Sequence, residues 1–184
     1  MELAIRPVSP DQHDAVMRYF DLVAYADNPA WSSCYCMERL VPDFDRRTRD
    51  ENRAERSALI RSARANGLVA YLLGRIVGWC HAAPKSELLN IPTGPERDVG
   101  AVVCFVVAPD SRRQGIATAL LAAACEQLKT RGMRAVEAYP WTDEPDDPSR
   151  WAQIQYVGPK AMYLKAGFEP VREIDDFTLV RKTL

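Results

Sequence analysis

The sequence predicts a mixed α/β domain over residues 1–184, built around a central sheet of about seven strands. Two observations predict this class. Apolar segments of strand length alternate along the chain with segments of helical periodicity. The longest apolar run, Val99–Ala108, is nearly unbroken, as expected for a central strand buried on both faces. The predicted order is strand, two helices, three strands, helix, strand, helix and two strands, which places the sheet between helices.

The chain begins with a predicted strand over residues 3–8 and a helix that starts at Ser9. Ser9 is the expected N-cap residue, Pro10 fits the first helical position, and Gln12 completes a capping box. A loop is expected from 27 to 43, because prolines interrupt that segment.

A second capping box, formed by Thr48 and Glu51, predicts the start of the second helix. We expect this helix to run to Asn66 and to end with Gly67 in the left-handed conformation that favours glycine. Its polar face, which includes Arg56, is rich in arginine and glutamate, so we expect that face to contact water.

The rest of the chain contains the remaining predicted strands and helices. Gly74 separates two apolar runs and predicts a hairpin, which a loop rich in proline follows. The expected segments, in order, are strands Leu68–Leu73 and Arg75–Ala83, loop 84–97, strand Val99–Ala108, helix Gly115–Arg131, strand Ala135–Tyr139, loop 141–158, helix Pro159–Lys165, and strands Phe168–Arg172 and Phe177–Lys182.

Composition narrows the classes of function. Lysine and arginine number 24 and aspartate and glutamate 25, so the net charge of −1 gives no basic footprint for nucleic acid. No apolar run approaches the roughly 20 residues that cross a bilayer, and the first residues lack the pattern of a secretory leader. The five cysteines include no Cys-x-x-Cys pair, so with two histidines we expect no metal and a reduced, cytoplasmic protein.

The segment that carries chemistry follows the predicted central strand. Residues 107–118 read Val-Ala-Pro-Asp-Ser-Arg-Arg-Gln-Gly-Ile-Ala-Thr. Gly115 begins a helix there, and the free N–H groups and positive dipole end of a helix N-terminus favour phosphate. Arg112 and Arg113 can add charge-assisted contacts. These features predict a pyrophosphate-binding loop, and the alternative is an ordinary turn with an arginine pair on the surface.

This segment resembles motif A of the GCN5-related N-acetyltransferase (GNAT) family. A second stretch, residues 161–168 (Ala-Met-Tyr-Leu-Lys-Ala-Gly-Phe), resembles motif B, in which Gly-Phe follows a tyrosine four residues later. The two motifs stand in the family's order, and so do the predicted elements. The resemblance covers essentially the whole chain, most firmly residues 99–172. It implies a mixed, mostly antiparallel sheet of about seven strands with helices on both faces.

The resemblance implies that acetyl-CoA is the co-substrate and that a primary amine attacks its thioester directly in a ternary complex. Tyr163 matches the family tyrosine that often protonates the departing CoA thiolate, and its alternative role is a core aromatic whose hydroxyl has a hydrogen-bond partner. A backbone N–H near Val106 would hold the oxyanion. The implied cofactor-binding residues are Phe105, Val106 and Val107 along the pantetheine arm, and Arg112, Arg113, Gln114, Gly115, Ile116, Ala117 and Thr118 around the pyrophosphate.

The general base is the point at which this sequence departs from the family pattern. Many relatives carry a glutamate on the central strand, but Val99–Ala108 contains no carboxylate. Glu137, flanked by apolar residues on the next strand, is the expected catalytic base, and its alternative role is a structural ion pair. His81 and Asp98 are the other candidates, and the alternative for His81 is a strand histidine whose ring is hydrogen-bonded. Cys104 has only apolar neighbours in the sequence, so we expect it to be a buried structural thiol.

Two aromatic loops are expected to form the acceptor site. Trp31 and Tyr35 lie in the first, and Trp141 begins the second, which is rich in carboxylates. Aromatic rings and negative charge favour a cationic amine, and the alternative for the second loop is a solvated acidic surface. Cys34 and Cys36 in the first loop lack the further ligands of a metal site.

The sequence therefore predicts an acetyl-CoA-dependent N-acetyltransferase that acts on the amine of a small molecule or peptide. We expect a monomer or homodimer with neither nucleic-acid nor membrane partners. Two alternatives stay open. One is a domain of the same fold that binds acyl-CoA without turnover, and the other is an enzyme that uses a longer acyl group or a hydroxyl acceptor.

Overall fold

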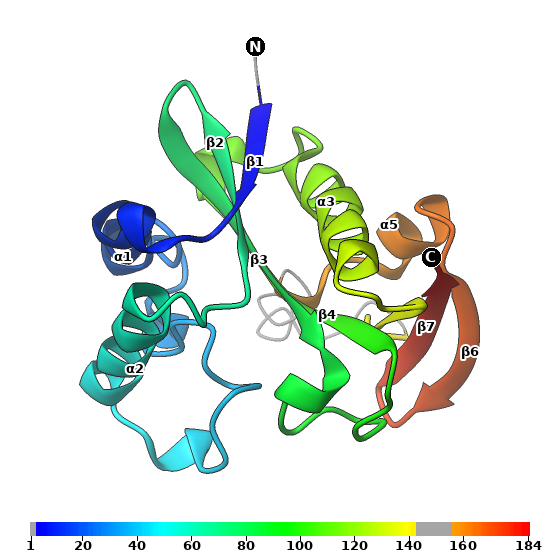
Figure 1. Cartoon of the computed structure of the whole chain (residues 1–184). Helices are drawn as coiled ribbons and strands as arrows, with labels where there is room; N and C mark the ends of the chain where they lie inside the picture. The colour runs from blue at the N-terminus through cyan, green and yellow to red at the C-terminus, as the bar shows by residue number, and fades with distance from the viewer. Residues whose placement is uncertain (1–2, 143–155) are drawn as a thin grey trace.

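The computed structural model describes residues 3–142 and 156–184, and its centre is a seven-stranded sheet (Figure 1). The strand order is β1-β2-β3-β4-β5-β7-β6. Neighbouring strands are antiparallel except β4 and β5, which confirms the predicted mixed, mostly antiparallel sheet. The strands are β1 (Leu3–Pro7), β2 (Leu68–Leu72), β3 (Arg75–Pro84), β4 (Val99–Val107), β5 (Ala135–Ala138), β6 (Glu169–Ile174) and β7 (Phe177–Thr183).

Helices lie on both faces of the sheet, as predicted (Figure 1). On one face lie α1 (His13–Leu22) and α2 (Arg49–Arg61). On the other lie α3 (Ile116–Thr130) and α5 (Lys160–Lys165). The apolar stripes of α1 and α3 explain their places, because each of these two helices buries its stripe against the sheet.

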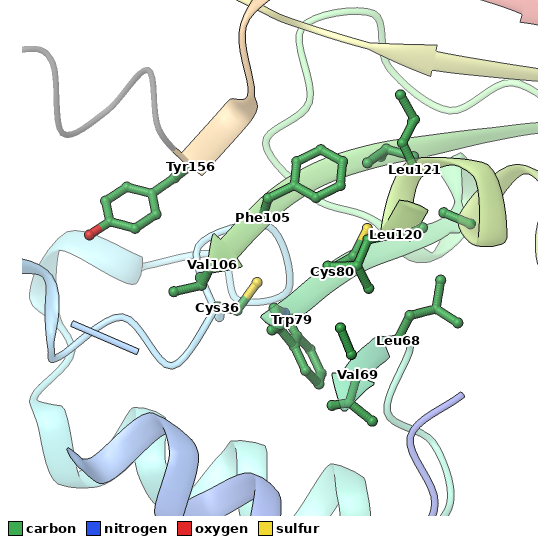
Figure 2. Close-up of a cluster of buried hydrophobic side chains, with 14 of the residues drawn as sticks. Cys36, Leu68, Val69, Trp79, Cys80, Phe105, Val106, Leu120, Leu121 and Tyr156 are labelled. Atoms are coloured by element: carbon green, nitrogen blue, oxygen red, sulfur yellow. The ribbon is translucent and has the colours of Figure 1, made fainter. Parts of the chain in front are cut away.

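Successive residues of β3 face the helices on opposite sides of the sheet. The ring of Trp79 lies 5.2 Å from that of Phe20 on α1, between centroids. A Cβ at Gly78 would lie about 3 Å from Ile116 and Leu120 of α3, so the absence of a side chain lets that helix approach the strand. Figure 2 shows Trp79 and Cys80 pointing to opposite sides of the strand. The sheet thus separates two apolar layers, each filled by one set of helices.

The end of α2 differs from the sequence prediction. The helix ends at Arg61 rather than Asn66, and Ala63 instead of Gly67 takes a positive φ, of 57°. Gly67 serves close packing instead, because a Cβ there would lie 2.2 Å from the ring of Trp79. This tertiary contact is invisible to a helical pattern.

The polar face of α2 also differs from the expectation. Arg56, expected to contact water, is wholly buried, and so is the neighbouring Asn52. The capping box that begins the helix is confirmed: the Glu51 N–H donates to Thr48 Oγ1 at 3.3 Å, and the Thr48 N–H donates to Glu51 Oε2 at 2.8 Å. The sequence pattern therefore predicts the start of this helix correctly, but the predicted exposure of its polar face is wrong.

The chain enters α1 through a short 3-10 turn. Ser9 and Gln12 pair as expected, with the Ser9 N–H donating to Gln12 Oε1 at 3.2 Å, but residues 10–12 form a 3-10 turn before α1. The predicted acidic loop 141–158 lies largely outside the described residues. Among residues 3–142 and 156–184, no helix combines the length and apolar character that a membrane crossing requires.

Candidate functional site

The sheet opens between β4 and β5. The two strands pair only over Val99–Val102, whereas β4 pairs with β3 as far as Val107. In the described part of the chain, no strand pairs with this edge of β4 beyond Val102. The backbone of Phe105, Val106 and Val107 therefore borders the opening. The carbonyl of Val106 accepts a hydrogen bond from Tyr19 Oη at 2.8 Å, which fixes α1 to this part of the strand.

A β-bulge marks the place where β4 leaves β5. His81 pairs with Cys104 and the next residue, Ala82, pairs with Val102, so Val103 is an extra residue on β4. A bulge bends its strand and increases the local twist. The opening of the sheet and the bend of its central strand thus coincide.

The loop after β4 enters α3 through Gly115, which has a φ of +79°. A Cβ at Gly115 would meet no atom within 4 Å. The first helical hydrogen bond runs from the Ala119 N–H to the Gly115 carbonyl at 3.0 Å, so the N–H groups of residues 116–118 precede the helical ladder. The space in front of this helix N-terminus is therefore open to an anion.

The two arginines of the loop have different environments. Arg112 donates to the Val107 carbonyl at 3.1 Å and, through Nη2, to Asp27 Oδ1 at 3.0 Å. This hydrogen bond holds the pKa of the Asp27 carboxyl below its usual value. Arg113 is exposed and has a φ of 61°. Arg112 thus fixes the loop to the segment after α1, while Arg113 faces water.

A cavity of about 230 Å³ adjoins the opening on the face that α1 and α2 cover. It reaches β4 at Val103 and Cys104, the residues at the bulge. Its remaining walls are Tyr25, Trp31, Cys34, Cys36, Glu38, Arg39, His81, Trp141, Tyr156, Val157 and Phe177.

The structure brings two of the expected acceptor residues together in this cavity. Trp31 contacts Tyr156 with 5.5 Å between ring centroids, and Trp141 lies 4.7 Å from Phe177. Tyr35 is not part of the wall. Its side chain is buried between the helices, and its hydroxyl donates to Asp21 Oδ1 at 2.6 Å. That hydroxyl belongs to the packing of α1 against α2.

His81 lies in the cavity wall and is wholly buried. Its Nδ1 lies 3.5 Å from Cys36 Sγ. Its Nε2 has no hydrogen-bond partner among the described residues. Asp98, the third candidate base, is exposed just before β4. Of these two candidates, only His81 lines the cavity.

Tyr163 lies on α5 behind β4. Its ring packs between Phe105 and Phe168, with centroids at 6.4 Å and 5.4 Å. Its hydroxyl donates to the carbonyl of Val157 at 2.6 Å, and Val157 lines the cavity. Burial raises the pKa of Tyr163 well above the usual value, so the group is a protonated donor at neutral pH.

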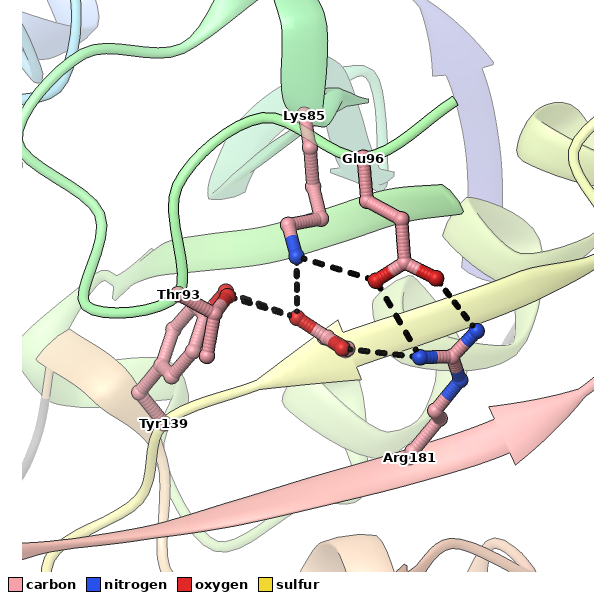
Figure 3. A network of polar contacts seen from close by, with 6 residues as sticks. Lys85, Thr93, Glu96, Tyr139 and Arg181 are labelled. Carbon is pink, nitrogen blue, oxygen red and sulfur yellow. Dashed lines mark hydrogen bonds and ion pairs between the residues drawn. The ribbon is translucent and has the colours of Figure 1, made fainter. Parts of the chain in front are cut away.

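Glu137 is held in a network of polar contacts, and its partners Lys85, Thr93, Tyr139 and Arg181 are labelled in Figure 3. Its carboxylate accepts hydrogen bonds from Lys85 at 2.8 Å, Thr93 at 2.9 Å, Tyr139 at 3.0 Å and Arg181 at 3.2 Å. It is 2% exposed and does not line the cavity. These contacts match the structural ion pair that was its alternative role, because every partner holds the carboxylate in place.

A sequence model of the Acetyltransferase (GNAT) family matches residues 29–168. The chain belongs to the GNAT acetyltransferase family. No protein of curated function shows significant sequence similarity to this GNAT protein.

Solved structures share the GNAT fold at low sequence identity. The PaiA N-acetyltransferase of Thermoplasma acidophilum, solved with coenzyme A, is 13% identical over 100% of both chains, with a TM-score of 0.58. The diaminobutyrate acetyltransferase EctA of Paenibacillus lautus, solved with L-2,4-diaminobutyric acid and coenzyme A, is 18% identical. That likeness covers 99% of this chain and 95% of EctA, with a TM-score of 0.55.

Two residues of the cavity wall in this GNAT protein, Cys36 and Tyr156, carry no clear signal in the sequence. Cys36 and His81 are separated by 45 residues, so no local pattern links them. The only signal was two cysteines in an aromatic loop, which indicates an apolar wall as readily as a reactive site. Within the described residues, no three His, Cys, Asp or Glu side chains are arranged to hold a metal ion.

Proposed function

We propose that this GNAT protein is an acetyl-CoA-dependent N-acetyltransferase that acetylates a primary amine of a small molecule or peptide. The observation that carries the proposal is the opening of the sheet beyond Val102, which lies next to the cavity. The cavity reaches β4 at Val103 and Cys104, where the strand leaves β5. An acyl group carried along the open edge would meet a second substrate there.

The open edge and the loop after it fit the arm and the pyrophosphate of acetyl-CoA. The backbone of Phe105–Val107 has lost its neighbour on the β5 side and would bind the pantetheine arm. The N–H groups of residues 113–118 would donate to the pyrophosphate, at the positive end of the α3 dipole. Exposed Arg113 adds charge, and Arg112 orders the loop through Asp27. Coenzyme A is present in the PaiA and EctA structures, which supports this cofactor.

The cavity fits an amine acceptor. Trp31, Trp141 and Tyr156 supply aromatic faces, and Glu38 supplies a carboxylate. Aromatic rings attract a cation by their quadrupole, and a carboxylate attracts it by charge. The EctA neighbour is named for an amine substrate of this kind, diaminobutyrate. We therefore expect a cationic primary amine to enter the cavity and lose a proton before it attacks.

Acid and base come from opposite sides of β4 in this proposal. Tyr163 would protonate the departing CoA sulfur, exchanging the Val157 carbonyl for that sulfur as its hydrogen-bond acceptor. His81 would take the proton of the amine, because its Nε2 has no partner among the described residues and its ring lines the cavity. Glu137 is the weaker choice, since its carboxylate is engaged by Lys85 and Arg181.

Calorimetric titration with acetyl-CoA, followed by a screen of amines for release of free CoA thiol, tests the proposal. The screen should hold a polyamine, an amino sugar and a lysine peptide. Binding in the micromolar range with amine-dependent release is the expected result. Binding without release for any amine would favour a domain that senses acyl-CoA. Failure of the protein to bind acetyl-CoA would overturn the proposal.

A further inference from the structure

Two charged side chains line the acceptor cavity, and they carry opposite charges. Glu38 and Arg39 are consecutive, and Arg39 Nη2 lies 3.1 Å from Glu38 Oε1. Among the described residues that line the cavity, no other side chain is an aspartate, glutamate, lysine or arginine. The fixed charges of this wall therefore sum to zero. Because charge complementarity selects binding partners, a wall with both signs favours a ligand with both signs over a cation alone.

Arg39 also borders the place where β4 leaves β5. A second cavity, of about 20 Å³, shares Arg39 and Val103 with the acceptor cavity and reaches Val102. A void of that size holds about one water molecule. Arg39 and Val103 therefore border the same narrow space. Val103 is the extra residue of the bulge, next to which the acetyl group would arrive.

The backbone around Arg39 is fixed by the loop that precedes β4. The Leu89 N–H donates to the Arg39 carbonyl at 2.8 Å. Asn90 Nδ2 donates to the carbonyls of Val41 at 3.1 Å and of Glu38 at 3.3 Å. Arg39 Nη1 in turn donates to the Asn90 carbonyl. A side chain that is held in place before a ligand binds loses little freedom on binding, which favours affinity.

The guanidinium of Arg39 retains N–H groups for a ligand. In the described part of the chain, its polar contacts are the Asn90 carbonyl and the Glu38 carboxylate. The ion pair with Glu38 is partly exposed, with side-chain exposures of 26% for Arg39 and 42% for Glu38, and such pairs are weak. A carboxylate of the ligand can therefore take the place of Glu38 on the planar guanidinium, whose parallel N–H groups match a carboxylate.

The rest of the cavity offers aromatic surface. Trp31, Trp141, Tyr156 and Phe177 all line it. Aromatic rings gain free energy when they cover apolar groups, and they contact other rings favourably. The cavity therefore combines one cationic group, one anionic group and a surface for an apolar side chain.

We propose that the acceptor is an α-amino acid with an apolar or aromatic side chain, acetylated on its amino group. Arg39 would bind the carboxylate, Glu38 would attract the ammonium, and the aromatic rings would cover the side chain. The α position follows from the narrow space that Arg39 shares with Val103, because only a short link between carboxylate and nitrogen fits there. This inference rests on the proposed acetyl-CoA-dependent function and names its substrate class. The direct attack of the free amine on the thioester is unchanged.

Amines without a carboxylate match this wall less well. A polyamine carries positive charge only, so it would bind next to Glu38 and meet the like charge of Arg39. An amino sugar has the same deficit. The side chain of a lysine within a peptide has it too, because the backbone carbonyl next to that residue is an amide. A free amino acid satisfies both charges at once.

Matched acceptors test the inference on the wild-type protein. The standard amino acids are incubated with acetyl-CoA, and release of free CoA thiol is measured. Each active amino acid is then compared with its amide and with the amine that lacks the carboxylate, which for phenylalanine are phenylalaninamide and phenethylamine. We expect kcat/KM to fall by roughly ten- to a hundredfold when the carboxylate is removed, as for loss of a charge-assisted hydrogen bond.

Variants assign the two charges. Arg39→Gln should reduce kcat/KM for the amino acid by a similar factor, mainly through KM, while the amine without a carboxylate loses far less. Arg39→Lys keeps the charge without the planar fork and should be intermediate. Glu38→Gln should reduce kcat/KM for both acceptors alike, because both carry the ammonium. Arg46→Gln is the control, at an exposed arginine before α2 that does not line the cavity.

The outcomes separate this inference from the proposed function. Release of CoA with another amine but with no amino acid would overturn the substrate class and leave the proposed function standing. Equal kcat/KM for an amino acid and its amine without the carboxylate would do the same. An equal loss for both acceptors in Arg39→Gln would show that Arg39 only shapes the wall. Failure to bind acetyl-CoA, or binding without release for any acceptor, would overturn the proposed function and this inference with it.

Discussion

Lys85 and Glu137 form an ion pair with 2.8 Å between Nζ and Oε2, at a place where Lys85 is 0% and Glu137 2% exposed. Strands β3 and β5 are not neighbours in the sheet, so this pair connects the end of β3 to β5 across β4. Arg181 on β7 joins the same carboxylate at 3.2 Å. The network therefore fixes the part of the sheet in which β4 and β5 remain paired, below the opening.

Removal of one partner of this pair should affect stability rather than chemistry. Glu137→Gln leaves the buried Lys85 with only the Glu96 carboxylate, at 3.6 Å, as a counter-charge, and the loss of one partner of a buried pair costs up to about 3–5 kcal/mol in comparable cases. We expect urea unfolding to show a loss of that order, while turnover per folded molecule changes little. Glu96→Gln is the matched control, because Glu96 joins the network with its side chain 45% exposed, and its loss should cost less than about 1 kcal/mol. Normal stability with abolished turnover would instead identify Glu137 as the base.

Two glycines next to the ends of α3 allow a sharp test of the predicted pyrophosphate loop. Gly115 and Gly132 flank the helix, have φ of +79° and +83°, and would both place a Cβ in open space. A glutamate at either position meets the same backbone strain. Only Gly115→Glu places a negative charge at the N-terminus, where it would repel the pyrophosphate. We expect calorimetry to show acetyl-CoA affinity reduced at least about tenfold, or 1.4 kcal/mol, for Gly115→Glu and little changed for Gly132→Glu. Equal losses would mean that strain, not charge, is responsible.

The features that the sequence predicted correctly are local. The Thr48–Glu51 capping box and the β4 run each depend on residues adjacent in the chain, and so does the glycine at the start of α3. The features that it missed depend on contacts between distant segments. Arg56 lies on a helix face of polar residues, and only the fold reveals that it is covered by the loop holding Tyr35 and Cys36.

The same difference between local features and contacts of distant segments explains which parts of the candidate site could be predicted. The loop at Gly115 was predictable because a helix N-terminus supplies its own N–H groups. The pairing of His81 with Cys36, and the engagement of Glu137 by Lys85, were not predictable because they join residues 45 and 52 positions apart. From residue type alone, His81 and Glu137 could each be catalytic or structural. The choice between these roles depends on the neighbours of each side chain in space.

Asp21 predicts a pH dependence of stability. It accepts hydrogen bonds from Arg53 at 2.9 Å and 2.8 Å and from Tyr35 at 2.6 Å, and the bond from Arg53 holds its pKa below the usual value. Because the folded pKa is the lower one, the stabilisation is complete above the unfolded value of about 3.9 and is lost as pH falls through the folded value. Asp21→Asn should cost about 1–2 kcal/mol at neutral pH.

Denaturant unfolding at pH 7 and pH 3 measures this effect. The gap in unfolding free energy between wild-type and Asp21→Asn protein should narrow at pH 3, since that pH lies below the unfolded value and unfolding of the wild-type protein then takes up a proton. Asp14→Asn, at a fully exposed aspartate on the same helix, is the control and should show little difference at either pH. A gap that is constant with pH would show that the carboxylate charge contributes nothing.

The contact of Gly67, in the loop between α2 and β2, with Trp79 predicts that substitutions at these two residues have coupled effects on stability. A Cβ at Gly67 would lie 2.2 Å from the ring of Trp79, which is wholly buried and cannot move aside freely. Gly67→Ala should therefore destabilise the protein by about 1–3 kcal/mol through overpacking. The smaller ring of Trp79→Phe leaves room for the added methyl group, so Gly67→Ala should cost less in that background. A double-mutant cycle measured by urea unfolding gives the coupling free energy directly. Additive losses would show that the loop shifts to accommodate alanine and that the indole does not require glycine at this position.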